Sequence, residues 1–164
     1  MNKIQVYIHG ENLQESKLID FPEKASANEI IEIYLRESGN TSKPEEWLVF
    51  IEEETEPRPN EFVFTDQEIK VKSHFHFHRC RTIATTIFYN GEDKFSHFSP
   101  STKASHILKK ALEAFRIKEV DAGDFRLKLD DKRVLNPNER IGSFATHSHC
   151  SVKLYLTDKK PIHG

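Results

Sequence analysis

The pattern that decides the fold lies in the stretch Thr85-Thr86-Ile87-Phe88-Tyr89-Asn90-Gly91-Glu92-Asp93-Lys94-Phe95-Ser96-His97-Phe98. Its two runs of β-branched and aromatic residues are separated by a turn that contains Asn90-Gly91. Asn-Gly is a strong signal for a tight hairpin turn, because both residues accept positive φ angles. The stretch therefore predicts two antiparallel strands, 85–89 and 94–98.

The first half of the chain shows the same order of elements. Strands are predicted at 4–8 and 17–21 around the turn sequence His9-Gly10-Glu11-Asn12, so Gly10 holds the place of Gly91. A helix follows each hairpin, with apolar residues at helical spacing. The first helix, 27–38, starts with a capping box formed by Ser26 and Glu29. The second helix opens at Pro100-Ser101-Thr102.

Three further strands are predicted after each helix. They lie at 47–51, 61–64 and 69–78 in the first half, and at 125–129, 132–135 and 152–157 in the second. A repeat of roughly 80 residues is too long for a solenoid and fits two copies of a small domain. One sheet curled around one helix is an α+β, β-grasp arrangement. We therefore predict two tandem β-grasp domains, residues 1–79 and 83–157, followed by an extended tail, 158–164.

Composition limits the classes of function. The net charge is −2, but the acidic residues concentrate in the first half and the basic residues in the second, which favours an acidic partner for the second half. No nucleic-acid-binding motif accompanies the basic residues, so we expect no nucleic-acid partner. No apolar run approaches the roughly 20 residues of a membrane span, and no signal peptide is recognisable, so we expect a cytoplasmic protein without membrane contact. In that compartment Cys80 and Cys150 are expected to be reduced thiols.

Three stretches of the second half resemble ubiquitin. Leu127–Lys132 stands where ubiquitin-like folds place a strand, a tight turn and a lysine, Arg140–Phe144 stands at their short helix, and Val152–Leu156 at their last strand. The resemblance covers nearly the whole chain and is more specific over residues 82–164. Two such domains with a glycine at the end of the second resemble the interferon-induced two-domain modifiers of vertebrates. They resemble more closely the BilA family, the tandem ubiquitin-like modifiers of bacterial antiphage conjugation (Bil) operons.

The resemblance implies that the chain is not an enzyme but the acyl substrate of one. The Gly164 carboxylate would be adenylated, passed to a cysteine as a thioester, and joined to an amine of a target lysine. The chain would bind no cofactor itself, since ATP and Mg²⁺ are used by the activating enzyme. The implied partners are ubiquitin-activating-type and ubiquitin-conjugating-type enzymes, a deconjugating peptidase, and target proteins whose candidates include phage structural proteins.

The resemblance also assigns recognition residues. The activating enzyme would grip the tail at Lys159, Lys160, Pro161, Ile162 and His163. Eukaryotic members end on a glycine pair, so His163 before a single Gly164 would restrict which activating enzyme accepts the tail. The conjugation machinery would dock on a charged face made of Lys128, Lys132, Arg133, Lys153 and Tyr155.

One unusual stretch leaves an alternative open. In Ser73-His74-Phe75-His76-Phe77-His78-Arg79-Cys80, period two places the phenylalanines on a core face and the three histidines and Cys80 on a solvent-side or interdomain face. Imidazoles with a thiolate could bind zinc, although alternate strand residues stand too far apart for all four to meet on one ion. We therefore expect no metal site, with His74, His76, His78 and Cys80 as the candidates for a metal-binding adaptor. The other alternative to a modifier is a tandem β-grasp module that binds partners without covalent attachment.

Overall fold

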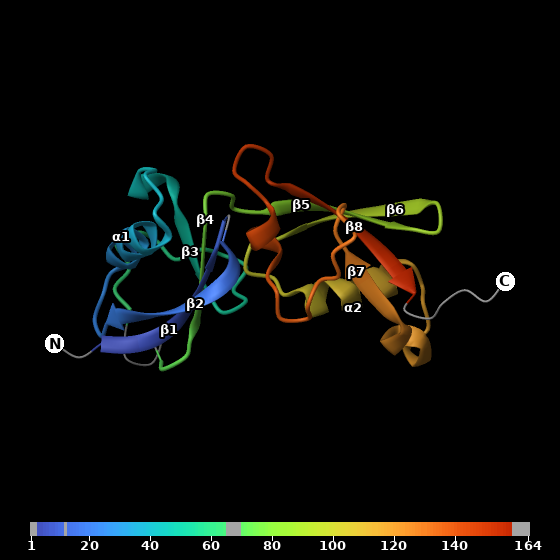
Figure 1. Ribbon diagram of the computed structural model, residues 1–164, viewed down its shortest axis with the longest axis horizontal. Coiled ribbons are helices and arrows are strands. Elements are labelled where there is room, and N and C mark those ends of the chain that lie inside the picture. The colour runs from blue at the N-terminus through green and yellow to red at the C-terminus, as the bar shows by residue number, and fades with distance from the viewer. Residues whose placement is uncertain (1–2, 12, 65–69, 159–164) are drawn as a thin grey trace.

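The computed structural model describes residues 3–11, 13–64 and 70–158. Two mixed sheets lie side by side along the long axis of the molecule, each with its own helix (Figure 1). The first half contains β1 (Lys3–Gly10), β2 (Leu13–Pro22), α1 (Ala27–Ser38), η1 (Pro44–Glu46), β3 (Leu48–Ile51) and β4 (His74–His78). The second half contains β5 (Ile83–Tyr89), β6 (Glu92–Phe98), α2 (Ala104–Ala114), η2 (Glu119–Asp124), β7 (Phe125–Lys128), η3 (Ile141–Phe144) and β8 (Ser151–Asp158).

The two sheets have the same topology. The strand order is β2-β1-β4-β3 in the first and β6-β5-β8-β7 in the second. In each sheet the first strand pairs in parallel with the last, and both outer pairs are antiparallel. A hairpin, a helix and a central parallel strand in this order form a β-grasp. The prediction of two tandem β-grasp domains is confirmed.

Local sequence signals operate as expected. Asn90 and Gly91 both have positive φ angles, 51° and 81°, as the Asn-Gly hairpin turn requires. The Ser26 side chain accepts a hydrogen bond from the Glu29 amide at 3.1 Å and caps α1. At the other end of α1, Gly39 adopts φ 70° and its amide bonds back to the last turn. The helix begins and ends at the predicted residues.

Three of the predicted strands are shorter than expected by more than one residue. The segments 61–64 and 132–135 form only isolated bridges, Ser26 to Val63 and Lys128 to Val134. Val63 and Val134 are exposed, so little apolar burial stabilises a longer pairing there. The expected strand 69–78 is described from residue 70 on, and regular pairing begins at His74, because Lys72 has φ 64° and interrupts the extended backbone.

Each domain has its own apolar core. In the first, the Tyr34 ring of α1 stacks on the Phe77 ring of β4 with centroids 4.4 Å apart, and Trp47 packs beside it. In the second, Ile107 of α2 packs among strand residues that include Ile83 and Leu154. Two separate cores explain how only 37% hydrophobic residues support 164 residues of chain.

The expectation of reduced thiols is wrong in this structure. Cys80, in the link between β4 and β5, forms a disulfide with Cys150, the residue before β8, with Cα atoms 5.7 Å apart. The parallel pairing of β5 with β8 explains the proximity, because Ala84 lies opposite Ser151 and the two strands enter the sheet together. No helix in the described part of the chain is both long and apolar enough to cross a membrane.

Candidate enzyme-docking face and carboxyl-terminal strand

The last strand sets the direction in which the carboxyl-terminal residues leave the second domain. β8 runs parallel to β5, beginning at Ser151 opposite Ala84, near the link to the first domain. It ends at Asp158, which pairs with Phe125 at the opposite end of the sheet, remote from the first domain (Figure 1). The residues assigned to tail recognition (Lys159, Lys160, Pro161, Ile162 and His163) and to conjugation (Gly164) lie outside the described residues.

Three of the five predicted docking residues share the outer face of the second sheet. Lys128 of β7 lies opposite Tyr155 of β8, and Tyr155 lies opposite Phe88 of β5. Lys153 precedes Tyr155 by two residues, so period two places it on the same face, where it is exposed. The face is therefore formed by neighbouring strands of one rigid sheet.

An aromatic pair lies at the centre of this face. The Tyr155 and Phe88 rings stack with centroids 5.2 Å apart and an interplanar angle of 20°. The Tyr155 hydroxyl donates a hydrogen bond to Asp130 Oδ1 at 2.7 Å, and this bond raises the pKa of the phenol. The bond and the stacking together hold the Tyr155 ring in one orientation on the sheet face.

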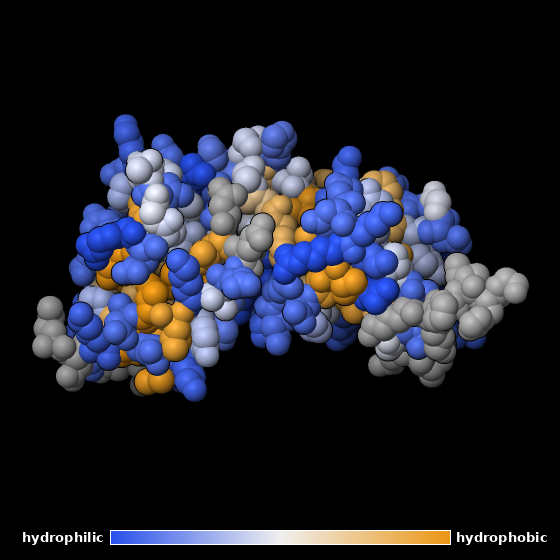
Figure 2. Space-filling view, in the orientation of Figure 1, coloured by the Kyte–Doolittle hydropathy of each residue, from blue (hydrophilic) through white to orange (hydrophobic). Residues whose placement is uncertain are grey.

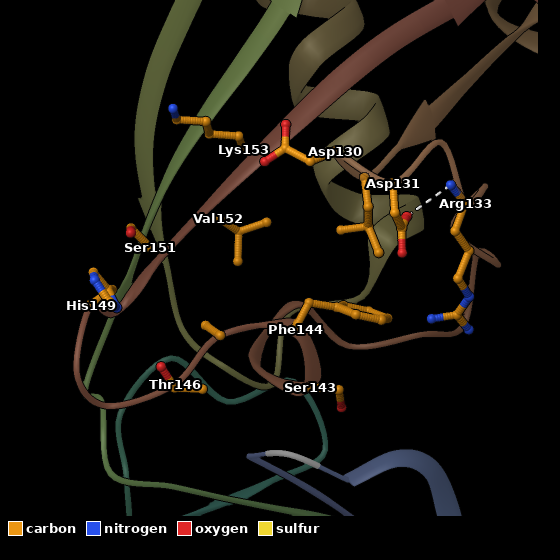
Figure 3. A pocket seen from close by; sticks show the side chains of 12 residues that line it. Asp130, Asp131, Arg133, Ser143, Phe144, Thr146, His149, Ser151, Val152 and Lys153 are labelled. Atoms are coloured by element: carbon orange, nitrogen blue, oxygen red, sulfur yellow. Dashed lines mark hydrogen bonds between the residues drawn. The ribbon is translucent and has the colours of Figure 1, made fainter.

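A cavity of about 670 Å³ lies beside the sheet face, where the last strand meets the loop that follows η3 (Figure 3). Its lining includes Lys153, Arg133, Asp130 and Asp131. Asp131 Oδ1 accepts a hydrogen bond from the Arg133 amide at 3.0 Å, shown as the dashed line in Figure 3. Two carboxylates therefore stand among the cations, and the cavity suits a partner of mixed charge.

The other two predicted docking residues lie at the edge of this region. Lys132 is exposed in the turn after β7 with φ 71°. Arg133 donates to Glu139 Oε2 at 2.9 Å, and its guanidinium lies 5.2 Å from the centre of the Phe144 ring. The structure thus brings Lys128, Lys153 and Tyr155 together with Arg133 nearby, while their role in docking an enzyme stays a prediction.

The aromatic and acidic members of this region were not among the predicted docking residues. Phe88 and Asp130 contact Tyr155 directly, and Phe95 on the edge strand β6 is 62% exposed. The alternation in β5 could have identified Phe88, since Ile87 points to the core and its neighbour must point outward. In the view of Figure 2 hydrophilic residues predominate, and hydrophobic residues gather in a limited area over each domain.

The histidine stretch forms an interdomain surface. Phe75 and Phe77 are in the core of the first domain, as predicted. On the other side of β4, His76 and His78 are fully buried, and Cys80 is in the disulfide. Within the residues that the structure describes, no group of three or more His, Cys, Asp or Glu side chains is placed to hold a metal ion. His74, His76, His78 and Cys80 therefore do not converge on a common site.

One family model matches the second domain. Residues 84–159 match the family model described as BilA ubiquitin-like domain 2. Similar solved structures include a ubiquitin of Caldiarchaeum subterraneum, with 15% identity, a TM-score of 0.40, and coverage of 51% of this chain and 99% of that one. A chain of a pParkin-pUb-UbcH7 complex has 16% identity and a TM-score of 0.40, covering 50% of this chain and 24% of that one. A protein designed on the basis of ubiquitin has 17% identity and a TM-score of 0.40, covering 51% and 95%. No curated protein sequence matches this chain.

Proposed function

We infer that this chain, a BilA-type tandem ubiquitin-like protein, is a modifier that is attached to other proteins through the carboxylate of Gly164. The observation that carries the proposal is the family match of the second domain, whose last strand, β8, ends at the side of the domain remote from the first domain. A tail that starts at this end can enter the channel of an enzyme without obstruction by the first domain. Proteins of this kind are substrates of conjugating enzymes and do not themselves catalyse the transfer.

The chemistry requires activation of the carboxylate. A carboxylate is a poor electrophile, so an activating enzyme with ATP and Mg²⁺ would form an acyl adenylate at Gly164 and release pyrophosphate. A cysteine thiolate of that enzyme would then displace AMP and form a thioester. The acyl group would pass to a conjugating enzyme, and a lysine amine of the target would displace the thiolate to form the isopeptide bond. A deconjugating peptidase would hydrolyse the isopeptide bond with water, which gives back the free Gly164 carboxylate and the lysine amine.

The outer face of the second sheet is the proposed contact for these enzymes. Tyr155 and Lys153 provide a fixed aromatic ring and an exposed cation on one strand. We assign the pathway to the bacterial cytoplasm and to antiphage defence, on the basis of the BilA-type match. The prediction that Lys128 and Arg133 take part in docking belongs to the same proposal.

Reconstitution with a cognate ubiquitin-activating-type enzyme tests the proposal. Purified chain, ATP and Mg²⁺ should give a band on a non-reducing gel that disappears with thiol, and Gly164→Ala should abolish it. Gly123→Ala is the matched control, because a Cβ atom at Gly123 meets nothing within 4 Å, and it should form the thioester normally. Equal thioester from the Gly164→Ala protein would overturn the proposal.

A charge reversal tests the docking face separately. Lys153→Glu should slow thioester formation or transfer, while Lys24→Glu, at an exposed lysine of the first domain, should not. Equal rates for the two variants would remove Lys153 from the docking face and leave the role of Gly164 unaffected.

A further inference from the structure

The outer face of the first sheet is covered by the second domain. His9 of β1 lies opposite His76 of β4, and His76 lies opposite Phe50 of β3, so the three form one row across the sheet. His76 and Phe50 are fully buried, and Phe50 lies outside the core cluster of the first domain. Segment η3 of the second domain contacts this region, and a Cβ atom added at Gly142 would collide with His76 Nε2. The domains are therefore in close contact over a face that carries histidines.

The hydrogen bonds of His78 fix its neutral form. Its Nε2 lies 2.9 Å from Gly142 O and 3.1 Å from Ala145 O, and because both are acceptors the proton is on Nε2. Its Nδ1 accepts a hydrogen bond from the Cys80 amide at 2.9 Å. A second proton on Nδ1 would face that amide, so protonation breaks the bond that joins β4 to the interdomain link.

In the part of the chain that the structure describes, the neighbouring histidines also lack acceptors for a second proton. Neither nitrogen of His76 has a hydrogen-bond partner among the described residues. The His76 ring stacks between those of His9 and His78, with centroid distances of 6.2 and 6.0 Å. His9 Nε2 lies 2.8 Å from His74 Nδ1, so only one of these two nitrogens carries a proton. A charge on His9 or His76 would be buried beside other imidazoles and, for His76, without a hydrogen-bond partner within the described ranges.

The surrounding charges do not reverse this preference. Burial lowers the pKa of His76 well below its ordinary value, and burial together with the buried Arg140 lowers that of His9 to about 3. Burial also lowers the pKa of His74, and Arg140 adds to this effect while Glu52 opposes it. Burial lowers the pKa of His78 as well, where Arg79 adds to the effect and Glu11 opposes it. Among the described residues, the other titratable groups around the row and its adjoining cavity include Lys103, Glu15, Glu53, Arg133, Glu139 and, beside Glu11, His147.

We propose that this face is an acid-sensitive clasp, in which the domains remain docked while the histidine row is neutral and separate when it is protonated. Cys80 stays tied to the second domain by its disulfide, so the opening pivots about residues 78–80. Separation uncovers the outer face of the first sheet, which in the docked state is not available to partners. The clasp does not depend on conjugation through Gly164.

The direction of the pH effect follows from linkage. A histidine exposed by opening binds a proton below about pH 6.5, whereas the docked form of these rings does not. Docking is therefore fully stable above pH 6.5 and weakens as the pH falls. Below pH 6.5, each histidine that stays neutral in the docked state lowers the docking constant about tenfold per pH unit. At pH 5.0 the docking constant is therefore about 30-fold lower than at neutral pH for each such histidine. His9 and His76 together give a factor of about 1,000.

Small-angle X-ray scattering of the full chain with its disulfide intact, from pH 8 to pH 4.5, tests the proposal. The radius of gyration should rise as the pH falls while the far-UV circular dichroism stays constant. His76→Leu, an apolar replacement of similar volume, should move the midpoint to lower pH. His106→Gln, at an exposed histidine of α2, is the matched control and should leave it unchanged.

Titration of the imidazole resonances of the wild-type protein decides the question even if His76→Leu fails to fold. Transitions of His9 and His76 that coincide with the opening, with no separate titration near pH 6.5, support the clasp. A constant radius of gyration down to pH 4.5, or rings that titrate near pH 6.5 in a protein that stays compact, would overturn it.

Discussion

Replacement of Glu11 by Gln should be the most informative single test of how the two domains are joined. The Glu11 side chain is completely buried at the start of the β1–β2 turn, yet its partners lie outside the first sheet. Oε1 accepts from Arg79 Nε at 3.0 Å and from the Arg79 amide at 3.3 Å. Oε2 accepts from Arg79 Nη2 at 2.5 Å and from the His147 amide of the second domain at 3.1 Å. One carboxylate thus binds the first domain to the link and to the second domain.

The magnitude follows from the geometry. Breaking a buried ion pair by removing one partner costs about 3–5 kcal/mol. Arg79 is 15% exposed and can recover some solvation, so the lower end, about 3 kcal/mol, applies. Glutamine also destabilises the fold in a second way, because its amide nitrogen is itself a donor and would face the N–H donors of Arg79 or His147. At about 2–4 °C per kcal/mol for a chain of this size, the melting temperature should fall by about 6–12 °C.

Calorimetry at pH 7.5 measures the effect. Glu45→Gln, at an exposed carboxylate of η1, is the control and should change stability by no more than about 0.5 kcal/mol. Arg79→Met in the Glu11→Gln background should cost less than in the wild type, because the two residues are coupled. A loss below about 1 kcal/mol for Glu11→Gln would refute the argument that this buried pair holds the domains.

The pH dependence of the same variant gives an independent check. Burial raises the pKa of Glu11, but the Arg79 hydrogen bonds and the His147 amide outweigh it, so the pKa lies below its ordinary value. The carboxylate therefore contributes its full stabilisation above the ordinary value and loses it as the pH falls through the lowered one. The difference between wild type and Glu11→Gln should be constant from pH 7.5 to 5.5 and shrink in more acidic solution. A difference that grows on acidification would contradict this assignment.

Further predictions concern the link and the cores. Replacing both Cys80 and Cys150 by Ser removes a cross-link across 70 residues and should lower the unfolding free energy, measured in urea, by about 2–4 kcal/mol. A wild-type unfolding free energy that does not change when reductant is added would contradict the pairing. Gly142→Ala places a Cβ atom 2.9 Å from Pro100 O and should cost about 1–3 kcal/mol, with Gly123→Ala as an unaffected control; equal stability of the two variants would show that the backbone adjusts freely. Phe77→Ala removes the ring stacked on α1 and should cost about 3–5 kcal/mol by thermal unfolding, so a loss below about 2 kcal/mol would mean that the first core collapses into the space.

The sequence alone determined the elements and their order. Asn90-Gly91, the Ser26 cap and Gly39 act through the backbone of their own neighbours, so their effects are visible within a few residues. Alternation likewise assigned Phe75 and Phe77 to the core, because strand periodicity is local. The same signals overestimated the strands at 61–64 and 132–135, whose extent depends on burial that no local pattern reports.

Only the tertiary structure decided which side chains meet across the domains. Cys80 meets Cys150, Glu11 meets His147, and His76 meets Gly142. The two residues of each pair lie more than 60 positions apart in the sequence. These contacts depend on how the second domain is placed on the first sheet. The repeat pattern does not determine this placement, because each domain has its own core. The histidine face of the stretch 73–80 was predicted to be either solvent-side or interdomain. His76 and His78 are buried because the surface that covers them belongs to the second domain, and local periodicity cannot choose between the two alternatives.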